Sequence, residues 1–269
     1  MIKDIVVNLP VGGAADVATP FAGSIAAKLE AHLTGIAFRC EPVIHPPAII
    51  ESQRAEIEEA AKAAVARFEE AASRAAIPGQ AHIVDAPVDA APGMFASIAR
   101  RFDLSVLAQP QPDEPALARL FVEAALFESG RPVLVVPYIQ TAGLKLERVL
   151  VAWDGSRSAA RAIGDAMPLL VRAKATEIVM VAGEPAKSDE LPGAEIAHHL
   201  ARHGVKVEVE RIPATDVDIA STILSHAADV SADFLVMGGY GHSRMREFML
   251  GGATRGILGS MTIPTLMSH

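Results

Sequence analysis

The chain has 269 residues, 51% of them hydrophobic, and a formal net charge of −8. The length suits two domains of about 130 residues better than one, and the apolar content excludes a disordered chain. The acidic balance, with no cluster of Lys and Arg, argues against a nucleic-acid partner. The one cysteine, Cys40, excludes an internal disulfide and predicts a reducing, cytoplasmic compartment. We expect neither a signal peptide nor a membrane span.

Apolar runs of strand length alternate with helical patterns through the first half of the chain. Strands are expected at 3–9, 33–40, 81–86, 104–108 and 132–138, and helices at 15–31, 51–76, 92–102 and 115–128. Residues 41–50 carry Pro42, Pro46 and Pro47 and therefore predict a loop. Such alternation indicates a parallel sheet with helices on both faces.

The second half repeats this pattern. Strands are expected at 147–152, 177–182, 206–211, 234–237 and 263–267, and helices at 158–171, 190–203, 217–230 and 246–258. Aligning Val7 with Val151 gives an offset of 144, and aligning Asp103 with Asp233 gives 130, so the first half holds 14 extra residues. The proline-rich loop after Cys40 is the expected place for them. This internal duplication predicts domains at 1–140 and 146–269, joined by a linker at 139–145.

Glycines follow the fourth strand of the second half. The apolar run from Asp233 to Met237 breaks into Gly238-Gly-Tyr-Gly241, and Gly251-Gly252 follows nine residues later. Glycines just beyond a strand let backbone N–H groups approach a ligand closely, and N–H groups that lead into a helix favour phosphate. Each glycine within a helical pattern costs about 1 kcal/mol relative to Ala, which indicates that something lies close to this pair.

The spacing Gly238-x2-Gly241-x9-Gly251 resembles the nucleotide motif of the universal stress protein family, G-x2-G-x9-G followed by Ser or Thr. The duplication resembles tandem members of that family across essentially the whole chain. The resemblance implies an α/β fold of two doubly wound parallel-sheet domains, Rossmann-like and similar to adenine nucleotide alpha hydrolases, that form a pseudo-dimer. It also implies ATP or another adenine nucleotide as the ligand. Gly252 departs from the motif, because the family's ATP binders usually carry a hydroxyl residue there.

The resemblance places the nucleotide at the carboxyl ends of the strands in the second half, where ligands bind doubly wound sheets. It implies that backbone near Gly183 meets the adenine, that Asp154 meets the ribose or base, and that the glycines approach the phosphates. The predicted binding residues are Ala152, Asp154, Val181, Gly183, Met237, Gly238, Gly241, Gly251, Gly252, Ala253 and Thr254.

Further candidates for contact with the phosphates, by placement alone, are Ser243, Arg244 and Arg255. Mg²⁺ would screen a triphosphate, although no carboxylate pair dedicated to a cation is visible. No catalytic residue and no metal site is predicted.

The first half lacks such a site. Its fourth strand is followed by Gln109-Pro-Gln-Pro-Asp-Glu114, which has no glycine and two carboxylates that would repel phosphate. The prolines remove backbone donors, and Pro10 stands where Asp154 falls in the repeat. One nucleotide site is therefore expected, in the second half. Gly12-Gly13 could bind another ligand or could simply turn the chain.

Several of these residues have plainer interpretations. Asp154 or Ser156 could only cap the helix that follows, and Trp153 could stack on a base or belong to the core. His198, His199 and His203 predict a solvated helix face rather than a metal site. Cys40 is expected to be buried and inert.

Three functions compete. The chain could be a nucleotide-binding stress-response sensor or switch, a slow ATPase of similar fold, or an interaction module with a vestigial site. Catalysis requires a group that orients the nucleophile near the γ-phosphate, and none is evident, so the first is favoured. The resemblance also implies that single-domain relatives dimerise through their last strands. Residues 132–138 and 263–267 are therefore expected to pair within one chain, and a homodimer of whole chains stays open.

Overall fold

The computed structural model describes residues 1–12, 15–41, 47–111, 116–182, 193–213, 217–239 and 252–269. It divides into two compact units, Met1–Leu144 and Lys145–His269. No helix within the described ranges is both long enough and apolar enough to cross a membrane.

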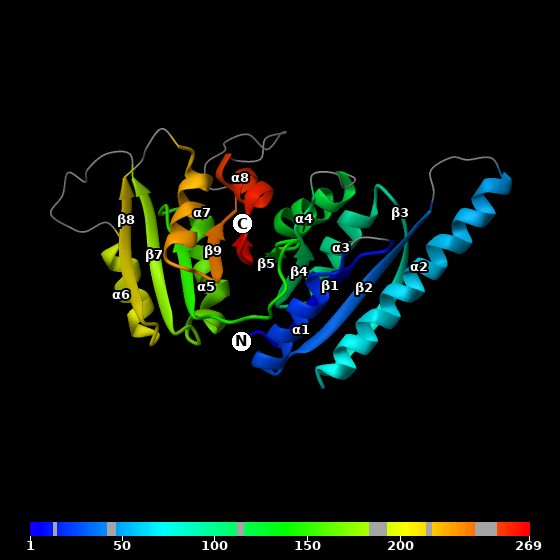
Figure 1. Cartoon of the computed structure of the whole chain (residues 1–269), viewed down its shortest axis with the longest axis horizontal. Coiled ribbons are helices and arrows are strands. Elements are labelled where there is room, and N and C mark those ends of the chain that lie inside the picture. The colour runs from blue at the N-terminus through cyan, green and yellow to red at the C-terminus, as the bar shows by residue number, and fades with distance from the viewer. Residues whose placement is uncertain (13–14, 42–46, 112–115, 183–192, 214–216, 240–251) are drawn as a thin grey trace. The chain divides into compact units, whose positions relative to one another are not determined.

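The first unit is a parallel sheet with strand order β3-β2-β1-β4-β5. Its elements are β1 (Asp4–Leu9), α1 (Ala18–Leu29), β2 (His32–Glu41), α2 (Pro47–Arg74), β3 (Gly79–Pro87), α3 (Ala91–Ala99), β4 (Leu104–Ala108), α4 (Ala116–Glu128) and β5 (Val133–Val136). The connections through α1 and α2 lead from β1 to β2 and β3 on one side of the sheet, and those through α3 and α4 lead back across it to β4 and β5. Because parallel crossovers are right-handed, this reversal of direction places α1 and α2 on one face of the sheet and α3 and α4 on the other. The contacts between α1 and α2, and between α3 and α4, agree with this arrangement (Figure 1).

The second unit has the corresponding strand order, β8-β7-β6-β9-β10, and its neighbouring strands are again parallel. Its elements are β6 (Arg148–Ala152), α5 (Arg157–Leu170), β7 (Ala175–Ala182), α6 (Ala194–Arg202), β8 (Val207–Pro213), α7 (Ile219–Asp229), β9 (Phe234–Gly238), α8 (Gly252–Ser260) and β10 (Thr265–Ser268). The predicted α/β class with two tandem parallel-sheet halves is confirmed. Residues 246–251 of the last predicted helix lie outside the described residues.

One pair of hydrogen bonds shows the duplication at atomic level. The Asp103 carboxylate accepts from the backbone N–H of Lys3 at 2.7 Å, and the Asp233 carboxylate accepts from that of Glu147 at 2.8 Å. Each carboxylate ties the start of its unit's fourth strand to the start of the first. The two pairs are related by the offsets read from the sequence, so the alignment of the two halves is confirmed.

The extra length of the first half lies between β2 and β3, where α2 alone has 28 residues. The prediction of a loop over 41–50 was wrong in its second part, because α2 begins at Pro47. Proline is tolerated in the first turn of a helix, where its missing N–H would have no intrahelical partner. The proline signal therefore marked the start of a helix rather than the middle of a loop.

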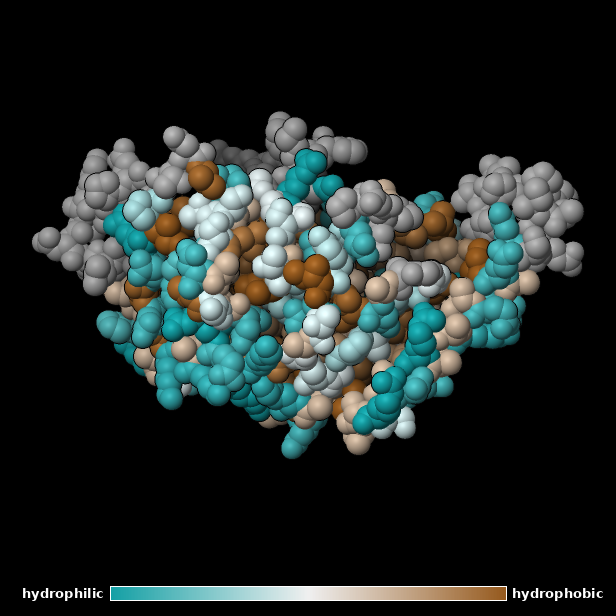
Figure 2. Space-filling model, viewed as in Figure 1, coloured by the Kyte–Doolittle hydropathy of each residue, from teal (hydrophilic) through white to brown (hydrophobic). Residues whose placement is uncertain are grey.

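The long helix α2 has one buried stripe and one charged face. Ala61, Ala64, Phe68 and Ala72 are buried and recur at helical spacing. On the exposed face, Lys62 pairs with Glu58 at 2.9 Å, an i, i+4 ion pair typical of a solvated helix face. Figure 2 shows hydrophilic side chains, mixed with some of intermediate hydropathy, along the described part of this helix.

The segment after β5 is fixed to α1 of its own unit. The backbone N–H of Leu144 donates to Ser24 Oγ at 2.8 Å, and Lys28 Nζ donates to the Leu144 carbonyl. Most of the predicted linker therefore packs on the first unit, and the boundary between the units falls at residues 144 and 145.

Candidate functional site

The predicted nucleotide residues of β6, β7 and β9 lie at the carboxyl edge of the second unit's sheet. Ala152, the last residue of β6, is paired with Met237 of β9 on one side and with Val179 of β7 on the other. Val181 continues β7 toward the same edge, and Gly238 ends β9. The parallel register therefore brings Ala152 and Val181 to the same edge as Met237 and Gly238, although the three strands are separate in the chain.

The turn after β6 presents Asp154 at this edge. Its side chain is exposed, and Oδ1 accepts from the backbone N–H of Ser156 at 2.9 Å. Gly155 has a φ of +74°, a left-handed conformation that favours glycine. Ser156 caps α5, because its side chain accepts from the N–H of Ala159 at 3.1 Å. The alternative that Ser156 serves as a helix cap is thus confirmed, whereas Asp154 shapes the turn before it.

Gly238 has a packing role that the sequence did not indicate. A Cβ at this position would lie 2.5 Å from the Ala159 nitrogen, 2.7 Å from Ser158 Oγ and 2.8 Å from the Ser158 carbonyl carbon. The end of β9 therefore touches the first turn of α5, with no room for a side chain. Close approach requires glycine here even before any ligand is considered.

Helix α8 carries three of the predicted residues in different environments. Gly252, its first residue, is exposed and has open space where a Cβ would point. Ala253 is partly exposed, whereas Thr254 is 2% exposed and faces inward. Arg255 is exposed. The predicted residues Gly183, Gly241 and Gly251, and the candidates Ser243 and Arg244, lie outside the described residues.

Comparison with protein families gives the decisive match for this half. Residues 145–269 match the universal stress protein family. This second half of the chain belongs to the universal stress protein family. No protein with curated annotation matches the sequence.

Solved structures extend the likeness to the whole of this universal stress protein. A universal stress protein from Archaeoglobus fulgidus matches with a TM-score of 0.69 and 16% identity, over 99% of this chain and 96% of that one. A protein of unknown function from Pseudomonas aeruginosa gives 0.61 and 16%, over 99% and 92%. A second Pseudomonas aeruginosa protein, a putative universal stress protein, gives 0.59 and 17%, over 99% and 93%. At these identities the likeness shows a shared two-domain fold.

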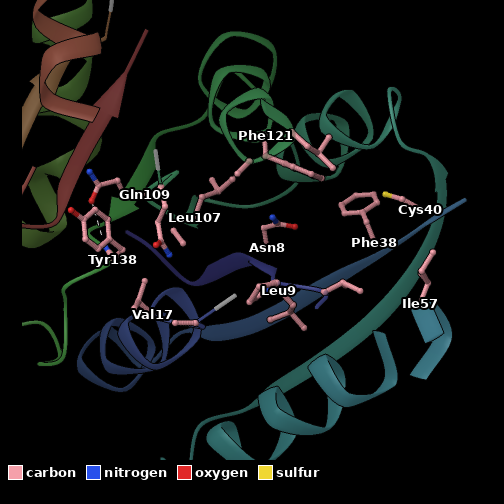
Figure 3. Close-up of a pocket in the computed structure, with 17 residues that line it drawn as sticks. Asn8, Leu9, Val17, Phe38, Cys40, Ile57, Leu107, Gln109, Phe121 and Tyr138 are labelled. Atoms are coloured by element: carbon pink, nitrogen blue, oxygen red, sulfur yellow. Dashed lines mark hydrogen bonds between the residues drawn. The ribbon is translucent and has the colours of Figure 1, made fainter. Parts of the chain in front are cut away.

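Sequence reasoning missed a cavity in the first unit of this universal stress protein. The cavity, of about 710 Å³, lies at the carboxyl ends of β1, β2 and β4, where the second unit has its predicted nucleotide edge (Figure 3). Cys40 lines it and is partly exposed, so the expectation of a fully buried cysteine was wrong. Burial nevertheless raises the pKa of the Cys40 thiol. The signal in the sequence was the uncharged run Asn8-Leu9-Pro10-Val11, which spans the end of the first strand and the residues after it.

The histidines of α6 and of its C-cap lie on the surface of the second unit. His198, His199 and His203 are exposed, and the rings of His199 and His203 meet edge to face at 4.8 Å. Within the described ranges, no group of three or more His, Cys, Asp or Glu side chains could hold a metal ion.

Proposed function

We propose that the second unit binds an adenine nucleotide and that this universal stress protein acts as a stress-response sensor or switch, not as a catalyst. The observation that carries the proposal is the pairing of Ala152 with Met237, which brings the Asp154 turn and Gly238 to one edge of the sheet. The match of residues 145–269 to the family supports it, as does the spacing of Gly238, Gly241 and Gly251.

Two features of this edge suit a nucleotide. The exposed Asp154 carboxylate, oriented by its bond to Ser156, can accept hydrogen bonds from ribose hydroxyls. The first N–H groups of α8 have no partner within the helix, and the helix dipole favours an anion beside them. Gly252, the first described residue of α8, is exposed. Phosphates placed there would be held by backbone donors, with Mg²⁺ as an accompanying ion for a triphosphate.

Replacing Asp154 with Asn is expected to weaken nucleotide binding about tenfold, the effect of losing one charge-assisted hydrogen bond. An Asn side chain still offers an oxygen to the Ser156 N–H, so the turn and α5 should persist. Isothermal titration of the full chain with ATP, ADP and AMP measures the change. Asp229→Asn, an exposed change at the far end of α7, is the control and should bind as the wild type does. Equal affinity in Asp154→Asn would show that Asp154 does not contact the nucleotide. If the unaltered chain binds none of the three nucleotides, the alternative of an interaction module with a vestigial site is favoured instead.

Restoring the missing hydroxyl by Gly252→Ser is expected to tighten ATP binding by about three- to tenfold and to leave AMP unchanged. The structure has open space for the new side chain, so no repacking opposes it. Serine is also a better residue than glycine at a helix start, which should keep α8 intact. Competition titrations of ATP against AMP measure the ratio. An equal gain for both nucleotides would show that the hydroxyl acts on the helix and not on the outer phosphates.

The pairing of the last strands of the two halves and any homodimer of whole chains remain predictions. Hydrolysis of the bound nucleotide is likewise not assigned.

A further inference from the structure

The cavity of the first unit occupies the place where ligands bind doubly wound sheets. β1 is flanked by β2 and β4, and the strand order reverses between them. The cavity opens beyond the ends of these strands and is closed from another side by α4, through Leu117, Ala118 and Phe121. Its volume of about 710 Å³ falls within the range of small-molecule sites, roughly 300–1,000 Å³.

The described part of this cavity's lining is uncharged. None of the 17 described residues around it is Asp, Glu, Lys, Arg or His. Burial raises the pKa of the Cys40 thiol, so the thiol stays neutral at physiological pH. A phosphate or carboxylate placed here would lose hydration without gaining a counter-charge from this lining. The cavity therefore selects against the charged nucleotide expected in the second unit.

One end of the cavity is apolar and rigid. Phe38 of β2 packs on Phe121 of α4 with ring centroids 5.3 Å apart, and Phe95 of α3 lies 5.9 Å from Phe121. All three are buried, at 6% exposure or less. Figure 3 shows Phe38, Cys40 and Ile57 together at this end. Interlocked aromatic rings from three elements hold this wall in place.

The other end offers polar groups. Gln109, which is 2% exposed, and Tyr138, which is 43% exposed, lie together there in Figure 3, and Asn8 lies between the two ends. The backbone N–H of Tyr138 donates to Gln109 Oε1 at 3.3 Å, so the amide is oriented by the chain. A hydroxyl, carbonyl or amide on a ligand could bond with the Tyr138 hydroxyl or with Asn8.

We propose that the first unit binds an uncharged, elongated amphipathic molecule. Its apolar body lies against Phe38, Phe121 and Ile57, and its neutral hydrogen-bonding head lies toward Gln109 and Tyr138. The duplicated fold then carries two ligand chemistries at equivalent places, a neutral apolar one in the first unit and a phosphorylated one in the second. This site does not depend on the nucleotide proposal, since the two lie in separate units.

The test uses the full chain and the neutral fluorescent probe N-phenyl-1-naphthylamine. We expect saturable binding and displacement of the probe by 1-dodecanol. Dodecyl phosphate has the same chain with a charged head and should displace it at least about tenfold less well, because the lining offers no counter-charge. ATP should not displace it. Equal or better competition by dodecyl phosphate, or probe binding that does not saturate, would overturn the proposal.

A pair of variants on α4 locates the probe. Ala118 lines the cavity, whereas Ala116 is exposed on the same helix outside the lining. Ala118→Phe should fill the space and weaken probe binding at least about tenfold, and Ala116→Phe should bind as the wild type does. Equal affinity of both variants would place the probe elsewhere and contradict the site.

Cys40 gives a second measurement that needs no variant. As the one cysteine of the chain, and as part of the apolar end, it reports directly on occupancy. Its reaction with N-ethylmaleimide should slow several-fold when 1-dodecanol saturates the protein and should be unaffected by ATP. This measurement decides the question even if Ala118→Phe fails to fold. An unchanged labelling rate at saturating 1-dodecanol would overturn the proposal.

Discussion

A Gly238→Val variant should lose at least about 3 kcal/mol of stability in its second unit, because overpacking against backbone adds to the loss of a helix cap. The new Cβ would lie 2.5 Å from the Ala159 nitrogen, an atom that cannot move without breaking its bond to Ser156 Oγ. Either β9 or the first turn of α5 must therefore shift. Urea unfolding followed by Trp153 fluorescence measures the effect, since Trp153 is the one tryptophan of the chain and lies in the second unit.

Gly252→Ala is the matched control for this glycine. It introduces the same Cβ at a helical position with nothing within 4 Å, so stability should be unchanged or rise by up to about 1 kcal/mol. If the urea midpoint of Gly238→Val equals that of the wild type, β9 and the first turn of α5 can move apart without loss of stability. The expected loss also means that weakened ATP binding in Gly238→Val would report on folding, not on contacts to phosphate. Asp154→Asn is the cleaner probe of the site, because the Asp154 side chain is exposed.

The architecture was predictable because the duplication supplied an internal control. Asp103 and Asp233 could be aligned from the sequence, and the structure gives their carboxylates the same backbone partner at the start of each unit. The order of the elements was predictable for a second reason. The hydrophobic periodicity of each segment shows which of its faces must be buried, and this distinguishes strands from helices. The edge that gathers Ala152 and Met237 followed from parallel strands sharing one direction.

What could not be predicted depends on contacts between distant elements. The sequence shows Gly238 beside other glycines, and only the packed fold shows that α5 touches it. The cavity of the first unit is likewise made by β1, β2, β4 and α4 together, so the uncharged run 8–11 was not enough to predict it. Pro47 was misjudged for a simpler reason, because a proline that starts a helix and one that bends a loop look the same in isolation.

Glu177→Ala should destabilise the second unit by about 2–3 kcal/mol, near the lower end of the range for breaking a buried ionic cluster. Glu177 is 5% exposed within β7, and its carboxylate bonds both Arg148 Nη1, at 3.0 Å, and His226 Nε2 on α7. Its removal leaves two polar side chains in a partly buried place without their shared acceptor. Arg148 and His226 keep some access to water, which holds the loss below that of a fully buried pair. Urea unfolding followed by Trp153 fluorescence again gives the value.

Glu208→Ala is the control on the neighbouring strand. Glu208 is directly paired with Glu177 in the β7–β8 register but is exposed, so its loss should change stability by no more than about 0.5 kcal/mol. A double-mutant cycle with His226→Ala separates the contribution of the Glu177–His226 bond to stability from the contribution of Glu177 to packing within its strand. If Glu177 acts through His226, the two changes together should cost at least about 1 kcal/mol less than the sum of the single changes. Strict additivity would mean that Glu177 stabilises the strand on its own and that the bond to α7 adds nothing.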